Sequence, residues 1–163
     1  FAKTSAVILL VVVVILLSVV ISFFVENHQI EVDLPKTNHY VWNNGSTVSI
    51  GNYTGLRAKT FRQNLFSNYT IDYSTGSIMN YATVFAILFS SVTGILNGAN
   101  MSGELKEPSK AIPKGTIYAV CFTFSTYFIL VTLVAGSCTR YLLVNDYVFL
   151  QQVSIWKPLV VIG

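Results

Sequence analysis

Residues 6–25 form an apolar run of 20 residues in which Ser18 and Ser22 are the only polar side chains. At ~1.5 Å of rise per residue, a helix of this length spans ~30 Å, the thickness of the hydrocarbon core of a bilayer. Valine and isoleucine dominate the run and would favour strands in water. In lipid the backbone must satisfy its own hydrogen bonds within the segment, which favours a helix. The run therefore predicts a transmembrane helix over residues 5–25.

The composition of the whole chain agrees with a membrane protein. Of its 163 residues, 53% are hydrophobic and 10% are charged, whereas soluble domains have about 25% charged residues. Disordered chains combine low hydrophobicity with high charge, so disorder is excluded as well. The net charge of +3 is too small to indicate a nucleic-acid partner. Because the chain begins with Phe1 and ends in an apolar run at 158–163, we expect a piece of a longer protein.

Residues 26–77 form a polar segment that follows the first apolar run. This segment contains three N-glycosylation sequons, with the acceptors Asn44, Asn52 and Asn68. Glycan transfer requires exposure on the lumenal side of the membrane, so three sequons in one segment favour an extracellular, glycosylated loop. The three lysines of residues 106–115 favour a cytosolic loop, since short lysine-rich loops face the cytosol.

Residues 74–103 contain no charged residue, and we expect a broken transmembrane helix over residues 78–105. Small and polar residues that disfavour a continuous helix mark the break: Gly94, Asn97, Gly98, Asn100 and Gly103. Irregular backbone at membrane depth is tolerated where it lines a cavity, and the two half-helix ends can bind a cation and an anion. Packing of helices through a G-x-x-x-G pair is the alternative interpretation.

The remaining residues continue the alternation across the membrane. Pro108 and Pro113 are expected to stop helices within the cytosolic loop. Residues 116–137 then predict another transmembrane helix, and residues 138–157 an extracellular amphipathic segment. The last residues, 158–163, predict the start of a further span.

No motif in the chain indicates an enzyme, a cofactor or a resident metal. Cys121 and Cys138 would lie ~25 Å apart on one helix, too far for a disulfide. His28 and His39 lie in the polar segment without a nucleophile signature, and we expect them to be solvated. Glu104, at the end of the predicted broken helix, is expected to be solvated at the cytosolic rim, and the other predicted spans contain no charged residue, so no charged relay is expected.

Residues 91–116, which read SVTGILNGANMSGELKEPSKAIPKGT, resemble the cation–chloride cotransporters, solute carrier family 12. The resemblance implies membership of the amino acid–polyamine–organocation superfamily. It implies an all-α membrane protein, here a fragment of an inverted-repeat (LeuT-like) transporter with a discontinuous helix. The spans would be helices 5, 6 and 7 and the start of helix 8 of that fold. Residues 73–76 with Asn80, and Asp146 and Tyr147 with residues 154–160, resemble one branch of the family.

The resemblance also implies residue roles. Ser90, which stands where the family has a proline, and Thr93 would bind the cation, and the amides of Gly94, Ile95 and Leu96 would bind chloride. The implied function is symport of chloride with potassium, sodium or ammonium, with a role in cell volume homeostasis.

The implied location is the plasma membrane or, alternatively, a lysosomal or other endomembrane. The implied partners are the two ions, the lipid bilayer, and a second copy or a related cotransporter. A non-transporting regulatory partner of cotransporters and an amino acid or polyamine permease remain open as alternatives.

Overall fold

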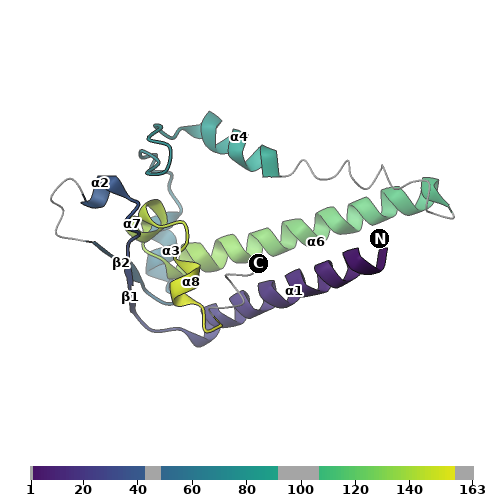
Figure 1. Cartoon of the computed structure of the whole chain (residues 1–163), viewed down its shortest axis with the longest axis horizontal. Coiled ribbons are helices and arrows are strands. Elements are labelled where there is room, and N and C mark those ends of the chain that lie inside the picture. The colour runs from purple at the N-terminus through teal and green to yellow at the C-terminus, as the bar shows by residue number, and fades with distance from the viewer. Residues whose placement is uncertain (1, 43–48, 92–106, 157–163) are drawn as a thin grey trace. The chain divides into compact units, whose positions relative to one another are not determined.

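The computed structural model describes residues 2–42, 49–91 and 107–156. Its elements are α1 (Ala2–Val25), β1 (Ile30–Asp33), α2 (His39–Trp42), β2 (Ile50–Tyr53), α3 (Ala58–Asn64), α4 (Tyr81–Ser91), α6 (Pro108–Ser137), α7 (Arg140–Asn145) and α8 (Leu150–Val153) (Figure 1). The chain divides into two compact units. One comprises residues 1–77 and 130–163, and the other comprises residues 78–129.

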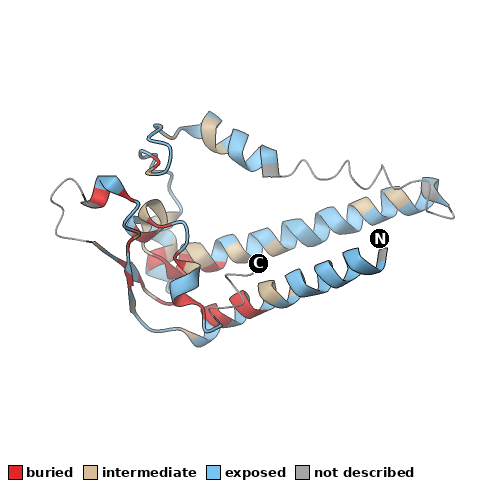
Figure 2. Cartoon of the chain, in the orientation of Figure 1, coloured by how far each residue is buried: buried red, intermediate tan, exposed pale blue. Residues whose placement is uncertain are grey.

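Two helices in the described part of the chain are long and apolar enough to cross a membrane, Lys3–Val25 and Ser109–Ser137. In their most apolar windows only 22% and 6% of the residues are buried, whereas the core helix of a soluble protein is mostly buried. Figure 2 shows most of each helix in the colour of exposed residues. Such apolar surface needs lipid or further helices to cover it.

Helix α6 begins at Pro108, eight residues before the predicted start at Thr116. The prediction that Pro113 stops a helix is therefore wrong, whereas a helix that would end before Pro108 falls in residues 92–106, outside the described part of the chain. Pro108 occupies the first helical position, where an N–H has no partner in the helix anyway. Pro113 lies inside the helix near its start, and a proline there removes one hydrogen bond from a helix of 30 residues. The carbonyl of Glu107 accepts hydrogen bonds from the N–H groups of Lys110 and Ala111, which starts the helix.

Residues 26–77 contain a two-stranded antiparallel sheet, so the fold is mostly helical rather than all-α. In its register Ile30 lies opposite Tyr53 and Asp33 lies opposite Ile50. Burial alternates along both strands, because side chains of a strand point to opposite faces. We call the described residues of 26–77 and 138–156 the cap domain.

The chain that leaves α6 pairs with the second edge of β2. Cys138 forms an isolated bridge with Tyr53. The N–H of Thr54 donates to the carbonyl of Ser137 over 2.7 Å, and the N–H of Thr139 donates to the carbonyl of Asn52 over 3.1 Å. Both edges of β2 are thus hydrogen-bonded, which removes the exposed edge of a lone hairpin.

The hydrophobic core lies where the cap domain meets the C-terminal ends of α1 and α6 (Figure 2). From α1 it contains Val19 and Phe23, and from α6 it contains Leu133. The cap domain contributes the other buried apolar residues: Val32, Leu34, Val41, Tyr53, Cys138, Leu142, Phe149 and Val153. The cap domain is therefore packed on the ends of both long helices.

The C-terminus of α6 is capped by residues of the segment that follows β2. The amide of Asn64 donates to the carbonyls of Ala135 and Cys138, both over 2.8 Å. The N–H of Arg57 donates to the carbonyl of Gly136 over 2.9 Å. The last carbonyls of a helix have no partner within it, and here the cap domain supplies the donors.

We predict that Asn64→Ala destabilises the cap domain by about 1–3 kcal/mol, because the carbonyls of Ala135 in α6 and of Cys138 just after the helix lose their donor. The measurement is thermal unfolding of the detergent-solubilised protein. Gln63→Ala is the matched control, since the side chain of Gln63 is exposed. Equal stability of the two variants would contradict the capping role.

Candidate functional site

The predicted ion site lies almost wholly outside the described residues. This applies to all members of the predicted break and chloride site, which are Thr93, Gly94, Ile95, Leu96, Asn97, Gly98, Asn100 and Gly103. The predicted cation ligand Ser90 is described and lies in α4. The structure therefore shows the helix that leads into the predicted site.

Helix α4 begins at Tyr81 because Asn80 caps it. The Asn80 Oδ1 atom accepts hydrogen bonds from the N–H of Thr83 over 2.9 Å and from its hydroxyl over 3.1 Å. Asparagine is a favoured residue at this position. Along the helix, the rings of Tyr81 and Phe85, and of Phe85 and Phe89, stack at 6.2 and 6.0 Å. The exposed aromatic side chains give α4 an apolar surface.

Ser90 lies in the last described turn of α4, and its side chain is exposed. Its hydroxyl donates to the carbonyl of Ile87 over 2.8 Å. The hydroxyl proton is thus used within the helix, as is common for serine in membrane helices. The resemblance implies that Ser90 would bind the cation through its main-chain carbonyl oxygen.

A second polar site lies in the cap domain, where Asp72 organises a tight turn. Its carboxylate accepts hydrogen bonds from the hydroxyls of Ser74 and Thr75 over 2.8 and 2.6 Å, and from the N–H of Ser74 over 3.1 Å. The N–H of Gly76, which has a φ of 70°, donates to the Asp72 carbonyl over 2.8 Å. Glycine adopts this left-handed conformation without strain.

Tyr147 holds this turn against the connection between α7 and α8. Its hydroxyl donates to the Asp72 Oδ1 atom over 2.7 Å, and its N–H donates to the hydroxyl of Tyr73 over 3.2 Å. The rings of Tyr73 and Tyr147 lie 4.6 Å apart. Of the residues that resemble one branch of the family, 73–76 and Tyr147 are thus brought into one cluster.

Hydrogen bonds set the charge state of this cluster. The hydroxyl of Thr75, followed by Tyr147 and Ser74, holds the pKa of Asp72 well below its usual range, although burial acts in the opposite direction. Desolvation and the neighbouring Asp72 carboxylate raise the pKa of Tyr147. Asp72 is therefore an ionised carboxylate that accepts hydrogen bonds from its neighbours.

Asp146, next to Tyr147, has a different environment. Its side chain is fully buried, and its Oδ1 atom accepts a hydrogen bond from the N–H of Val148 over 2.8 Å. The Oδ2 atom has no hydrogen-bond partner among the described residues. Burial raises the pKa of Asp146, which the bond from Val148 only partly offsets. Ionisation of this carboxyl therefore weakens the fold.

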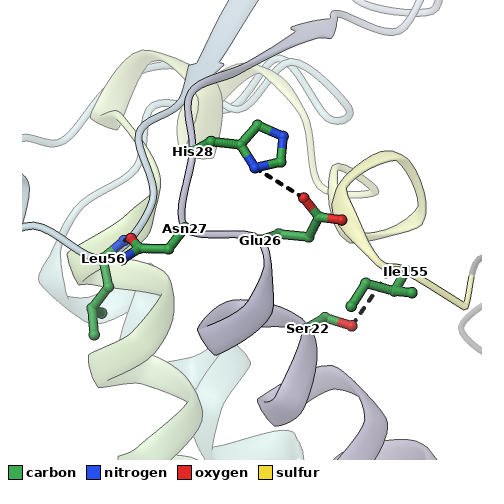
Figure 3. Close-up of polar contacts among 6 residues, drawn as sticks. All are labelled: Ser22, Glu26, Asn27, His28, Leu56 and Ile155. Atoms are coloured by element: carbon green, nitrogen blue, oxygen red, sulfur yellow. Dashed lines mark hydrogen bonds and ion pairs between the residues drawn. The ribbon is translucent and has the colours of Figure 1, made fainter.

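The C-terminus of α1 is joined to the cap domain by short polar contacts (Figure 3). The hydroxyl oxygen of Ser22 lies 3.4 Å from the N–H of Ile155, and the side chain of Asn27 accepts the N–H of Leu56 over 2.9 Å. The exposed His28 lies 3.2 Å from Glu26. Ser18 and Ser22, the two polar residues of the first apolar run, are buried.

The predicted glycosylation acceptors also lie in the segment that contains the sheet. Asn52 is exposed on β2, and Asn68 is exposed in the connection after α3. Asn44 lies outside the described residues. Cys121 and Cys138 are free, in agreement with the prediction of no disulfide between them. Burial raises the pKa of Cys138 to about 12, so this thiol is unreactive.

The sequence analysis missed Asn64, Asp72 and Asp146 as structural polar residues. For Asp72 a signal exists, since the sequence Asp-Tyr-Ser-Thr-Gly at residues 72–76 is rich in residues typical of a turn. Asn64 and Asp146 carry no such local signal. The hydrogen-bond partners of Asn64 and the burial of Asp146 depend on segments far away in the sequence.

Comparison with known proteins identifies the class to which this chain belongs. The amino acid permease family matches residues 1–162. The chain is 49% identical over 163 residues to solute carrier family 12 member 9 of Danio rerio, covering all of this chain and 18% of that protein. It is 52% identical to the human member 9 over 122 residues, which cover 74% of this chain and 13% of that protein.

A further relative is the bumetanide-sensitive sodium-(potassium)-chloride cotransporter of Manduca sexta. The identity is 42% over 88 residues, which cover 54% of this chain and 8% of that protein. No solved structure matches the chain significantly. The chain belongs to the amino acid permease family and, within it, to solute carrier family 12, which confirms the resemblance. It spans less than a fifth of the length of these relatives.

We predict that Tyr147→Phe destabilises the cap domain by about 1 kcal/mol at neutral pH, because the buried Asp72 carboxylate loses a hydrogen-bond donor. A carboxyl with a lowered native pKa stabilises the fold above its ordinary value of 3.8 and loses this contribution as the pH falls through the native pKa. The difference in unfolding free energy between Tyr147→Phe and the wild type should therefore become smaller as the pH falls below 3.8. Unfolding curves over a pH series measure it, with Tyr69→Phe as the exposed control.

We also predict that the free energy of unfolding of the protein increases when the pH is lowered. The raised pKa of Asp146 means that the native state binds its proton more tightly, so stability should increase as the pH falls through the native pKa towards the ordinary value of 3.8. Asp146→Asn should lose this rise, whereas Asp33→Asn, which changes an exposed carboxylate, should keep it. Parallel pH profiles for the wild type and Asp146→Asn would refute the assignment.

Proposed function

We propose that the protein of which this chain is a part couples chloride to a monovalent cation, potassium, sodium or ammonium, by symport. The observation that carries the proposal is the 42% identity to a bumetanide-sensitive sodium-(potassium)-chloride cotransporter. The exposed apolar surfaces of α1 and α6 support a multi-pass membrane protein, in which further helices or lipid cover them.

The proposed site is the break after α4. The carbonyl of Ser90 and the hydroxyl of Thr93 bind the cation, and the backbone amides of Gly94, Ile95 and Leu96 bind chloride. Backbone groups suit this task because a broken helix exposes carbonyls at one end and N–H groups at the other. The small and polar residues Gly94, Asn97, Gly98, Asn100 and Gly103 allow the irregular backbone. Helices elsewhere in the longer protein complete both sites.

The orientation is part of the proposal. The cap domain lies on the extracellular or lumenal side, supported by the sequons at Asn52 and Asn68, both exposed in the structure. Residues 106–115 lie on the cytosolic side, supported by their lysines. The protein resides in the plasma membrane or an endomembrane, and pairs with a second copy or a related cotransporter.

An amino acid or polyamine permease is the second candidate, which the match to the amino acid permease family favours. A non-transporting regulatory partner of cotransporters is the third. Amino acid uptake that does not require chloride would identify the permease. Co-purification with a related cotransporter, without ion flux, would identify the regulator.

We predict that the full-length protein takes up rubidium or ammonium in a chloride-dependent manner, and that Thr93→Ala reduces this uptake about tenfold or more. A tenfold change corresponds to ~1.4 kcal/mol, a modest value for one lost ligand. Tracer uptake in vesicles that contain the protein is the measurement. Thr123→Ala is the control, because the Thr123 hydroxyl is exposed and bonds to Ala119 of its own helix.

Uptake that is independent of chloride would contradict symport. Chloride-dependent uptake that Thr93→Ala leaves unchanged would contradict the placement of the cation site and leave the transport function standing.

A further inference from the structure

The sequon Asn52-Tyr53-Thr54 is built into the core of the cap domain. The Asn52 side chain is exposed on the outward face of β2, but Tyr53 is fully buried. The Thr54 hydroxyl oxygen lies 3.0 Å from the carbonyl oxygen of Ser137 and 2.9 Å from the hydroxyl oxygen of Thr60. A glycosylating enzyme must hold the whole sequon, with its hydroxyl accessible. The folded domain therefore keeps this sequon inaccessible to the glycosylating enzyme.

Main-chain groups of the same sequon also form hydrogen bonds within the cap domain. Asn52 pairs with Glu31 of β1, and its carbonyl accepts both the N–H and the hydroxyl of Thr139, over 3.1 and 2.9 Å. The N–H of Thr54 donates to Ser137. An enzyme could bind this segment only after the pairing with residues 137–139 had opened.

The sequon Asn68-Tyr69-Thr70 has the opposite environment. All three residues are exposed and lie outside the helices and strands. An enzyme can reach this segment without disturbing the core of the cap domain. The fold thus distinguishes two sequons that look equivalent in the sequence.

The order of synthesis leaves Asn52 accessible for a limited time. The Ser137 carbonyl that closes the sequon lies 83 residues after Thr54. At ~5–20 residues per second, the chain needs ~4–17 s to reach it. Before that point only β1 can pair with β2, and an isolated two-stranded hairpin is marginally stable.

We propose that Asn52 is an N-glycosylation site that is open only during synthesis and is closed when residues 137–139 pair with β2, whereas Asn68 stays open in the folded protein. The inference rests on the proposed lumenal orientation of the cap domain. The exposed Asn52 side chain lets the folded sheet carry the glycan that was attached earlier. The site is therefore modified according to the timing of folding.

The first experiment measures site occupancy in cells, by mass spectrometry of the full-length protein. The expected result is a glycan at both Asn52 and Asn68. A glycan at Asn68 without one at Asn52 would overturn this inference and leave the orientation intact. The absence of both glycans would overturn the orientation and the inference together.

The second experiment tests the closure. Full-length protein is made in cells whose lipid-linked glycan synthesis is blocked, purified, and incubated with oligosaccharyltransferase and lipid-linked glycan. Asn68 should be modified, and Asn52 should react about 100-fold more slowly, as expected for several hydrogen bonds that must open together. Similar rates at the two sites would overturn the inference.

A pair of variants separates closure from a poor acceptor sequence. Leu142 is fully buried and packs against Gly51 of β2. A Cβ atom added at Gly51 would lie only 2.6 Å from the Cδ1 atom of Leu142. Leu142→Asp should undock α7 from β2 and raise the rate at Asn52 at least tenfold. Val148→Asp adds the same charge at an exposed position and should leave the rate low. If Leu142→Asp loosens the domain, as proteolysis would show, without opening Asn52, the inference fails.

Discussion

The last carbonyl groups of α6 receive their hydrogen bonds from residues 54–64, and the cap domain is organised around this contact. The carbonyls of Ala135 and, just past the helix, Cys138 accept the side-chain amide of Asn64, and the carbonyls of Gly136 and Ser137 accept the N–H groups of Arg57 and Thr54. A helix end buried without donors would be unstable. Because these donors follow β2 directly, satisfying the helix end also brings residues 137–139 beside β2. One set of hydrogen bonds thus ends the helix and completes the sheet.

Polar contacts between distant segments hold the rest of the cap domain. The side chains of Ser22 and Ser154 lie 3.4 Å apart, the Asn38 amide bonds to Asn145 over 3.1 Å, and Tyr147 bonds to Asp72 over 2.7 Å. These pairs are separated by 132, 107 and 75 residues. Since buried polar groups are costly when a partner is lost, such contacts specify one arrangement. They join the end of α1 and the segments around Asn38 and Asp72 to α7 and the residues that follow it.

The parts predicted correctly from the sequence are those with a local cause. The apolar run at 6–25 and the uncharged residues of 116–137 lie within long helices, because lipid leaves the backbone few alternatives. The effect of proline was predicted wrongly at position 113, since that effect depends on the distance of the proline from the helix start. The sheet was missed because four-residue strands leave a weak pattern. The ion site stays a prediction, since residues 92–106 lie outside the described part of the chain.

By itself, the sequence determined that this chain has two stretches long and apolar enough to cross a membrane and that it belongs to its family, because hydrophobic length and a long contiguous motif are local properties. It also determined the sequons. The tertiary structure alone decided that β2 lies between β1 and the chain after α6, that Asp72 is ionised beside Tyr147, and that Asn52 and Asn68 differ in access. The physical reason is that burial and hydrogen-bond partners come from residues distant in the sequence. Their effect exists only once the chain has closed those long loops.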